Sequence, residues 1–226
     1  MIYIIVTSSF SIETDEIRKS QYTNCINKLK KIIEKDSLEW KVIIVENNGL
    51  RKTFFDDFGY EVHYTNNNFI QMNNKGYNEL KDVIDTITKY NIQDTDFVIK
   101  ITGRYILEDD SEFISTIKNL DNTNYDCVIK YGNYGVPVDY KTTDCITGII
   151  GMRSYYIKQI KLPTQHESVE CNWAKVTYLI DDNKIHKVNT LGIHICPGYD
   201  SISGALGYNQ TGNNSIIGVD IPYFLV

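Results

Sequence analysis

Residues 96–110 read DFVIKITGRYILEDD, and this stretch decides the fold. Apart from Lys100, residues 97–101 are apolar and predict a buried strand, and Gly103 is the first residue after it that can turn sharply. Ligands of open α/β sheets bind beyond the carboxyl ends of the strands, so we expect a site at this turn. Lys100 and Arg104 flank the turn and suggest an anionic ligand. The alternative is a solvated lysine and an arginine that caps an ordinary turn.

The overall charge restricts the partners of the protein. The net charge is −6, so the whole molecule does not attract nucleic acid or an anionic membrane, and any anion site must be local. The apolar run at residues 1–6 is too short for a signal peptide or a membrane span. The five cysteines are odd in number and include no CxxC pair, which favours reduced thiols. We therefore expect a cytoplasmic protein without a transmembrane segment and without nucleic acid as a partner.

The first half of the chain has the alternating pattern of an α/β protein. The 226 residues suit a single domain with a large core. Apolar periodicity predicts strands at 1–6, 40–45, 60–64 and 97–101, helices at 15–35 and 74–90, and a short helix at 51–58. With right-handed crossovers, this order gives a doubly wound parallel sheet whose strand ends meet along one edge.

After Arg104 the pattern is less regular, as expected if the chain builds the other wall of a cleft. We predict helices at 111–120, 155–160 and 167–179, strands at 126–131 and 146–152, and a loop at 132–143. Most of residues 185–226 have no clear assignment.

Four short motifs occur in order along the first 105 residues. They are TSSF (7–10), VIIVENNG (42–49), NKGYNEL (74–80) and IKITGRY (99–105). By these motifs the sequence resembles nucleotide-diphosphosugar glycosyltransferases of the GT-A fold. More narrowly, it is similar to small polysaccharide-type transferases that carry a KxTGRY element.

The resemblance implies a fold and an activity. The fold is α/β, a GT-A-like, Rossmann-type mixed sheet flanked by helices, with residues 1–105 binding the nucleotide sugar and residues 106–226 forming the acceptor and catalytic half. The activity is transfer of a sugar from a UDP- or GDP-type donor to a carbohydrate or glycan acceptor, as in glycan biosynthesis.

The resemblance also implies a set of donor-binding residues. It places Thr7, Ser8 and Ser9 near the nucleoside, Glu46 and Asn47 at the base or ribose, Arg18 and Lys75 at the phosphates, and Lys100, Thr102, Gly103 and Arg104 at the turn. Each has a structural alternative as a turn residue, a strand end or an exposed helix charge.

The turn after the fourth strand departs from the resembled fold. Such enzymes commonly have Asp-x-Asp there, which holds a divalent metal against the leaving diphosphate. This chain has Thr102-Gly103-Arg104 instead, and fixed cations can stabilise the same charge. We therefore expect a metal-independent or weakly metal-dependent enzyme that requires no cofactor, with Lys100 and Arg104 as the stabilising cations and Arg104 in a catalytic role. Asp109-Asp110 is the competing metal candidate, although acids here also suit the start of a helix.

An inverting transferase, which we slightly prefer, also needs a general base. Glu170 is our first candidate and Glu167 the second, because they lie three apart near the start of a predicted helix, where acids also complement the helix dipole. Asp144 is a third, and a retaining enzyme would need none. On the acceptor side we place Tyr131, Tyr134 and Asp144. His194 is a further candidate for a phosphate or metal site, although a lone histidine is more often structural.

Two other functions remain open. A sugar nucleotidyltransferase of related fold usually has a basic, glycine-rich loop after the first strand, whereas residues 7–16 are acidic. A catalytically inactive nucleotide-sugar-binding module would explain the missing Asp-x-Asp, but not the basic turn.

Overall fold

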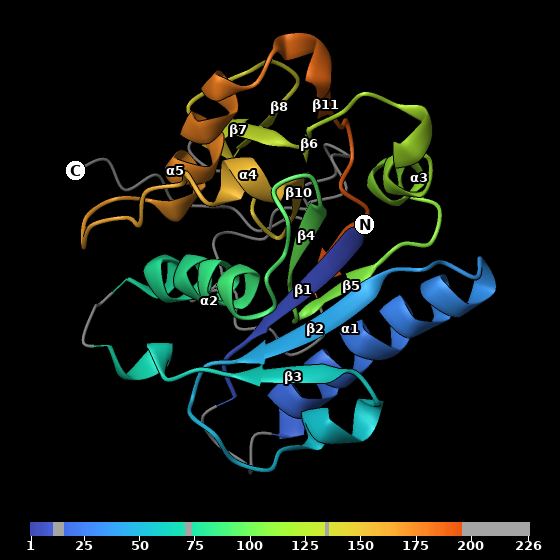
Figure 1. Ribbon diagram of the computed structural model, residues 1–226, viewed down its shortest axis with the longest axis vertical. Coiled ribbons are helices and arrows are strands. Elements are labelled where there is room, and N and C mark those ends of the chain that lie inside the picture. Colours follow the sequence, from blue (N-terminus) through green and yellow to red (C-terminus); the bar gives the residue numbers. More distant parts are fainter. Residues whose placement is uncertain (11–15, 71–73, 134–135, 196–226) are drawn as a thin grey trace, which may run out of the picture.

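A computed structural model describes residues 1–10, 16–70, 74–133 and 136–195 (Figure 1). The α-helices are α1 (Glu16–Lys35), α2 (Lys75–Lys89), α3 (Glu112–Lys118), α4 (Ser154–Ile157) and α5 (Val169–Val176). Short 3-10 helices are η1 (Phe54–Phe58), η2 (Asn67–Phe69), η3 (Leu120–Asn122), η4 (Thr177–Leu179) and η5 (Asp182–Lys184). The strands of the large sheet are β1 (Ile2–Ser8), β2 (Lys41–Glu46), β3 (Glu61–Tyr64), β4 (Phe97–Thr102), β6 (Cys127–Ile129), β10 (Ile149–Arg153) and β11 (Ile185–Lys187). Smaller sheets contain β5 (Tyr105–Leu107), β7 (Tyr131–Asn133), β8 (Val136–Val138), β9 (Asp144–Cys145) and β12 (Ile193–Ile195).

The centre of the molecule is a seven-stranded mixed sheet in the order β11-β6-β10-β4-β1-β2-β3. Strands β4, β1, β2 and β3 are parallel, and their carboxyl ends lie together, at the left in Figure 1. Strand β10 runs antiparallel to both β4 and β6. The mixed sheet expected from the resemblance is confirmed.

The alternation of side chains along each strand builds a core on both faces of the sheet. In β1, Ile4 and Val6 pack on one face with α1 and α3, whereas Ile5 packs on the other face with α2 and α5. Since both faces are covered, the parallel strands are apolar at almost every position. Because the faces of the sheet are apolar, its polar side chains lie mainly at the ends of the strands.

Most predicted elements are present within one to three residues of their expected ends, as usual for sequence patterns. The predicted helix at 167–179 is shorter, because α5 covers only Val169–Val176 and a 3-10 turn follows. Strands β5, β7, β8, β9, β11 and β12 were not assigned in advance. Strand β9 has two residues and each of the others has three, too few for a periodic signal.

Gly103 is needed at the turn after β4 for close packing and not for an unusual backbone angle. A Cβ atom there would lie 2.8 Å from Tyr22 Cδ1, 3.0 Å from Val6 Cγ1 and 3.1 Å from the carbonyl oxygen of Thr7. Its amide donates a hydrogen bond of 3.0 Å to that Thr7 oxygen. The turn is therefore held directly against the end of β1.

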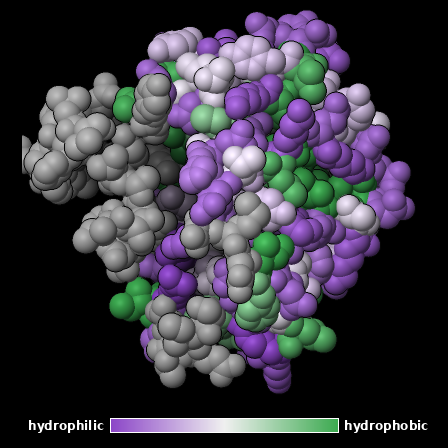
Figure 2. Space-filling model, turned by 90° about the vertical axis from the view of Figure 1, so that its left-hand side faces the viewer, coloured by the Kyte–Doolittle hydropathy of each residue, from purple (hydrophilic) through white to green (hydrophobic). Residues whose placement is uncertain are grey.

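No helix within the described residues is both long and apolar enough to cross a membrane. Figure 2 shows the side on which β1, β2 and β3 end, where the described surface is largely hydrophilic with hydrophobic patches between.

Candidate active site

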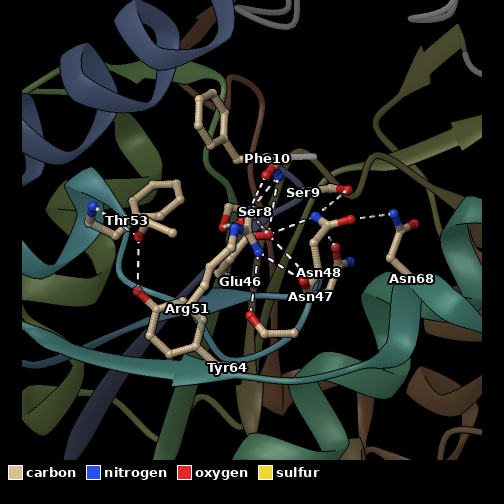
Figure 3. Close-up of polar contacts among 12 residues, drawn as sticks. Ser8, Ser9, Phe10, Glu46, Asn47, Asn48, Arg51, Thr53, Tyr64 and Asn68 are labelled. Carbon is tan, nitrogen blue, oxygen red and sulfur yellow. Dashed lines mark hydrogen bonds and ion pairs between the residues drawn. The ribbon is translucent and has the colours of Figure 1, made fainter. Parts of the chain in front are cut away.

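The buried carboxylate of Glu46 connects the ends of β1 and β2. Glu46 is 0% exposed, and its carboxylate oxygens accept hydrogen bonds from Ser8 Oγ at 2.9 Å and from the Phe10 amide at 3.0 Å. Asn48 donates from its backbone amide at 3.1 Å and its side-chain amide at 2.6 Å. Arg51 adds an ion pair at 3.4 Å, and Figure 3 shows Glu46 at the centre of this group. Glu46 was expected to hold the base or ribose, but its carboxylate is instead occupied by the protein itself.

Ser8 is likewise used inside the protein. Its hydroxyl lies 2.7 Å from the Val45 carbonyl oxygen as well as beside Glu46, and the residue is buried. The hydroxyl residues Thr7, Ser8 and Ser9, at the end of β1, were expected to contact a ligand. The structure gives the Ser8 hydroxyl a role in joining two strands, because the small polar side chain fits between their ends.

A second polar cluster joins the end of β2 to α2. Asn47 Nδ2 donates to Asp82 at 2.9 Å, and Thr65 Oγ1 and Asn67 Nδ2 each donate to the same carboxylate at 2.7 Å. Burial raises the pKa of Asp82 to about 6, although these three hydrogen bonds act in the opposite direction. Asn68 donates to Asn48 Oδ1 at 2.6 Å, so the Asn-rich loop after β3 is fixed onto the turn after β2.

Lys100 and Glu79 form an ion pair where β1, β4 and α2 meet. Lys100 Nζ lies 2.7 Å from Glu79 Oε1, and it donates to Thr102 Oγ1 and to the Thr147 carbonyl oxygen, each at 2.7 Å. Glu79 also accepts from Thr7 Oγ1 at 2.7 Å and Thr102 Oγ1 at 2.8 Å. The lysine is 1% exposed, whereas a quarter of the Glu79 side chain is exposed. Lys100 therefore does not present a free positive charge to a ligand, contrary to its predicted place beside the phosphates.

The ion pair sets the charge state of Glu79. Burial on its own raises the pKa of the carboxyl, but the Lys100 charge and the hydrogen bonds from Lys100, Thr7 and Thr102 outweigh burial and hold the pKa below its usual value of 4.5. Glu79 is thus an anion at neutral pH, and with Lys100 it makes a neutral unit.

Two arginines approach the segment that follows β1. Arg18, in the first turn of α1, donates to the Ser9 carbonyl oxygen at 3.3 Å, and the Ser9 amide donates to the Tyr22 hydroxyl at 3.0 Å. Burial raises the pKa of Tyr22 to about 12, while the bond to Ser9 and the charges of Arg104 and Arg18 act to lower it. Arg104 and Arg18 therefore both act on this one corner of the strand edge, which we call the cationic corner (Ser9, Arg18, Tyr22 and Arg104).

Lys75 is exposed as the first residue of α2. Asn74 caps this helix, because its side chain accepts from the Tyr77 amide at 3.2 Å. Helix α2 runs from the carboxyl edge of the strands, as its contacts with Asn47, Thr7 and Thr102 require. Lys75 consequently belongs to the same edge of the sheet as the cationic corner.

The two glutamate candidates for the general base lie in different surroundings. Glu170 Oε1 accepts from Thr147 Oγ1 at 3.3 Å, and the carbonyl of Thr147 holds Lys100. Glu167 lies before α5 in a turn, where its carboxylate accepts from the Thr164 amide at 2.8 Å, and this bond lowers its pKa. Glu170 is thus connected to the strand edge through Thr147, whereas Glu167 stabilises a turn.

The acceptor-side candidates lie in different surroundings. Tyr131 is 1% exposed and its hydroxyl is bonded to Thr177 Oγ1 at 2.7 Å, so its expected contact with an acceptor is wrong. It packs in the hydrophobic core together with Val169 and Trp173 of α5. Asp144, in β9, accepts from the Cys145 amide at 2.9 Å and is partly exposed. Tyr134 lies outside the described residues.

The competing metal candidates lie away from the strand edge. Asp109 forms an ion pair with Lys28 of α1, and His194 with Glu108, in a groove that Asp110 also lines. Within the described residues, no three His, Cys, Asp or Glu side chains are grouped to hold a metal ion. The turn after β4 offers no carboxylate of its own, and the nearby Glu79 is bound to Lys100, so these residues do not fit an Asp-x-Asp metal site.

Sequence reasoning missed Glu79, Asp82 and Thr147. A usable signal was present for Glu79: Lys100 shares its strand face with Val98, which packs under α2, so its ammonium required an acidic partner on that helix. Asp82 follows Asn78 by four residues on the same helix, in the pattern of an inward polar stripe. Thr147 carries no such signal, since it contacts Lys100 through its backbone.

Comparisons with known proteins bear on the fold. No protein-family model and no curated protein matches the sequence. The mannosyltransferase PcManGT from Pyrobaculum calidifontis, solved in complex with GDP-Man and Mn2+, matches with a TM-score of 0.52 at 10% identity, over 82% of this chain and 54% of that chain. The chain thus spans about half the length of that enzyme. A putative glucose-1-phosphate thymidylyltransferase from Bacillus anthracis matches with a TM-score of 0.51 at 11% identity, over 83% of this chain and 86% of that chain.

These likenesses define the class of fold. The chain has the mixed α/β fold of nucleotide-sugar transferases, and both matched proteins are transferases by their descriptions. The narrower resemblance to transferases with a KxTGRY element stays a prediction.

The first testable prediction concerns Glu46. In Glu46→Gln, one acceptor oxygen becomes an NH2 group that faces the donors of Ser8, Phe10 and Asn48. We expect the free energy of unfolding to fall by about 2–3 kcal/mol, because buried donors lose their acceptor. Urea denaturation measures the change, and Glu39→Gln, at an exposed acid before β2, is the matched control. Equal stability of the two variants would contradict the central role of Glu46.

The second prediction concerns the ion pair of Lys100 and Glu79. Glu79→Gln leaves the buried ammonium without a counter-charge and should cost about 3–5 kcal/mol of unfolding free energy. Lys100→Met leaves Glu79 partly in water and should cost less. The double variant Lys100→Met/Glu79→Gln should be more stable than Glu79→Gln alone, which the same denaturation experiments measure.

The ion pair also predicts a pH dependence. Because the folded protein lowers the pKa of Glu79, its stabilisation is complete above the unfolded value of 4.5 and is lost as the pH falls through the folded value. The stability of Glu79→Gln should therefore fall less steeply below pH 4.5 than that of the wild type. An identical acid slope would show that the carboxylate is not stabilised in the folded state.

Proposed function

We propose that the protein is a glycosyltransferase that binds a UDP- or GDP-type sugar at the carboxyl ends of β1, β2 and β4. The sugar is transferred to a carbohydrate or glycan acceptor. The observation that carries this proposal is the cationic corner, where Arg18 and Arg104 act on one segment next to the ends of parallel strands. Ligands of such sheets bind at this edge, and arginine suits bidentate contact with phosphate.

The charge arrangement favours Arg104 as the group that stabilises the leaving diphosphate. Departure of a nucleoside diphosphate develops negative charge, which fixed cations at the reacting end can stabilise. Lys100 is neutralised by Glu79, so in our proposal the positive charge comes from Arg104, with Arg18 and Lys75 nearby. Gly103 supports this role by holding the turn tightly against Thr7. No metal ion is required in this scheme.

In this proposal Glu170 is the general base, and the reaction inverts the configuration at the anomeric carbon of the transferred sugar. Its carboxylate deprotonates the acceptor hydroxyl as that oxygen attacks the anomeric carbon, while the bond to the diphosphate breaks. The contact with Thr147, whose carbonyl holds Lys100, supports a position facing the donor site. Asp144 is the second candidate for this role.

A sugar nucleotidyltransferase is the second candidate function. The likeness to a putative thymidylyltransferase is about as good as that to the mannosyltransferase, and it favours this alternative. In a nucleotidyltransferase, a phosphate oxygen of a sugar 1-phosphate would attack the α-phosphorus of a nucleoside triphosphate, giving the nucleotide sugar as pyrophosphate leaves. An assay for this release with UTP and GTP separates the two reactions.

The third prediction tests donor binding. UDP, GDP or CDP should raise the melting temperature of the protein, with and without manganese. At a nucleotide concentration of about 100 times the dissociation constant, the free energy of unfolding should increase by roughly 2.7 kcal/mol. If none of the three shifts the melting temperature, the proposal is wrong. A shift that strictly needs manganese would contradict the metal-free scheme alone.

Arg104→Ala should leave the fold intact and reduce sugar transfer by about 100-fold or more, as loss of one charge-stabilising group does. Arg104→Lys should recover part of the rate. Arg153→Ala is the matched control, because Arg153 lies beside Phe97 at the opposite edge of the sheet. Full transfer by Arg104→Ala would exclude its catalytic role.

The fourth prediction concerns the base. Glu170→Gln should reduce transfer by about 100-fold or more while nucleotide affinity is kept, because a general base contributes to the chemical step. Glu167→Gln, whose carboxylate serves a turn, should transfer at nearly the wild-type rate. Equal rates in both variants would point to Asp144 or to a retaining enzyme, and the anomeric configuration of the product, read by NMR, decides between these.

A further inference from the structure

Asn78, near the start of α2, has a buried side-chain oxygen that accepts no hydrogen bond from any described residue. The residue is 5% exposed, and its Oδ1 atom is buried without a partner in the described part of the chain. Its neighbours differ: Asn47 and Asn67 both bond to Asp82. A buried carboxamide without partners is unfavourable, so this position is suited to a ligand that supplies them.

The contacts of α2 define where Asn78 lies. Glu79, the next residue, contacts Thr7 and Thr102 at the ends of β1 and β4. Asp82, four residues on, contacts Asn47 just after β2. Residues four apart share one helix face, about one turn or 5.4 Å apart. Asn78 therefore lies one turn beyond the contact between Asp82 and Asn47, past the end of β2.

We propose that Asn78 binds the nucleoside part of the donor. This inference rests on the proposed function and adds a residue to its binding site. The carbonyl oxygen of the carboxamide accepts a hydrogen bond, so the complementary group is a donor: a ribose hydroxyl or an N–H of the base. The end of β2 is the nucleoside side of the edge in our scheme, because the cationic corner at β1 and β4 takes the phosphates.

A stability measurement tests whether Asn78 has a structural role. In the free protein, Asn78→Leu should keep or raise the melting temperature, because an apolar group of similar size replaces an unsatisfied amide. Asn67→Leu is the matched control and should lower it, since Asn67 donates to both Asp82 and Asp85. A fall in Asn78→Leu as large as that in Asn67→Leu would overturn the proposal.

Nucleotide affinity then tests the binding role. Calorimetry with UDP, or with GDP if that nucleotide stabilises the wild type, should give about tenfold weaker binding to Asn78→Leu. The 2′-deoxy and 3′-deoxy forms of the same nucleotide separate the two sources of the donor group. If Asn78 accepts from a ribose hydroxyl, the analogue that lacks it binds both proteins equally; if it accepts from the base, the loss is tenfold for every analogue.

The outcomes distinguish this inference from the proposed function. If the wild type binds a nucleotide and Asn78→Leu binds it equally tightly, the role of Asn78 is wrong and the proposed function stands. If UDP, GDP and CDP all fail to bind the wild type, both are overturned.

Discussion

The ion pair between Lys100 and Glu79 is the contact on which the arrangement of the strand ends depends. A lysine within a buried strand needs a partner, because an unpaired charge away from water is very costly. Glu79 supplies the charge, and the hydroxyls of Thr7 and Thr102 complete its hydrogen bonds. One cluster thereby fixes α2 against β1 and β4, and the Thr147 carbonyl attaches the chain before β10. The positions of Thr7, Thr102 and Thr147 at this edge follow from that attachment.

Burial of charge determines which residues are able to meet a ligand. Glu46 is enclosed by donors from Ser8, Phe10 and Asn48, and Lys100 is enclosed by acceptors. Such fully satisfied groups are fixed in place, and they orient their surroundings. Glu46 and Lys100 are thus enclosed at this strand edge, whereas Arg104 is partly exposed and Lys75, at the start of α2, is exposed.

The fold could be predicted from the sequence to a large extent, and the site much less. Buried strands and amphipathic helices leave apolar patterns of five or more residues, which is why β1, β2, β4, α1 and α2 were expected nearly where they lie. The short strands around Tyr131 leave no such pattern. Residue type alone also does not tell whether a charge is buried, so Lys100 and Glu46 were both assigned to the ligand. The face of each strand was the missing information, since Lys100 points under α2 together with Val98.

Helix α2 relates the separate parts of the site through its own geometry. Glu79 contacts the ends of β1 and β4, while Asp82 contacts Asn47 just after β2 and Asn78 precedes Asp82 by one turn on the same helix face. A shift of α2 by one residue would break the contacts of Glu79 and Asp82 together. The polar residues of this helix are therefore constrained as a group, and under the proposed function this would keep the nucleoside and diphosphate ends of the site at a fixed separation. For a transfer reaction this matters, because the anomeric carbon must be held at a set distance from the acceptor oxygen.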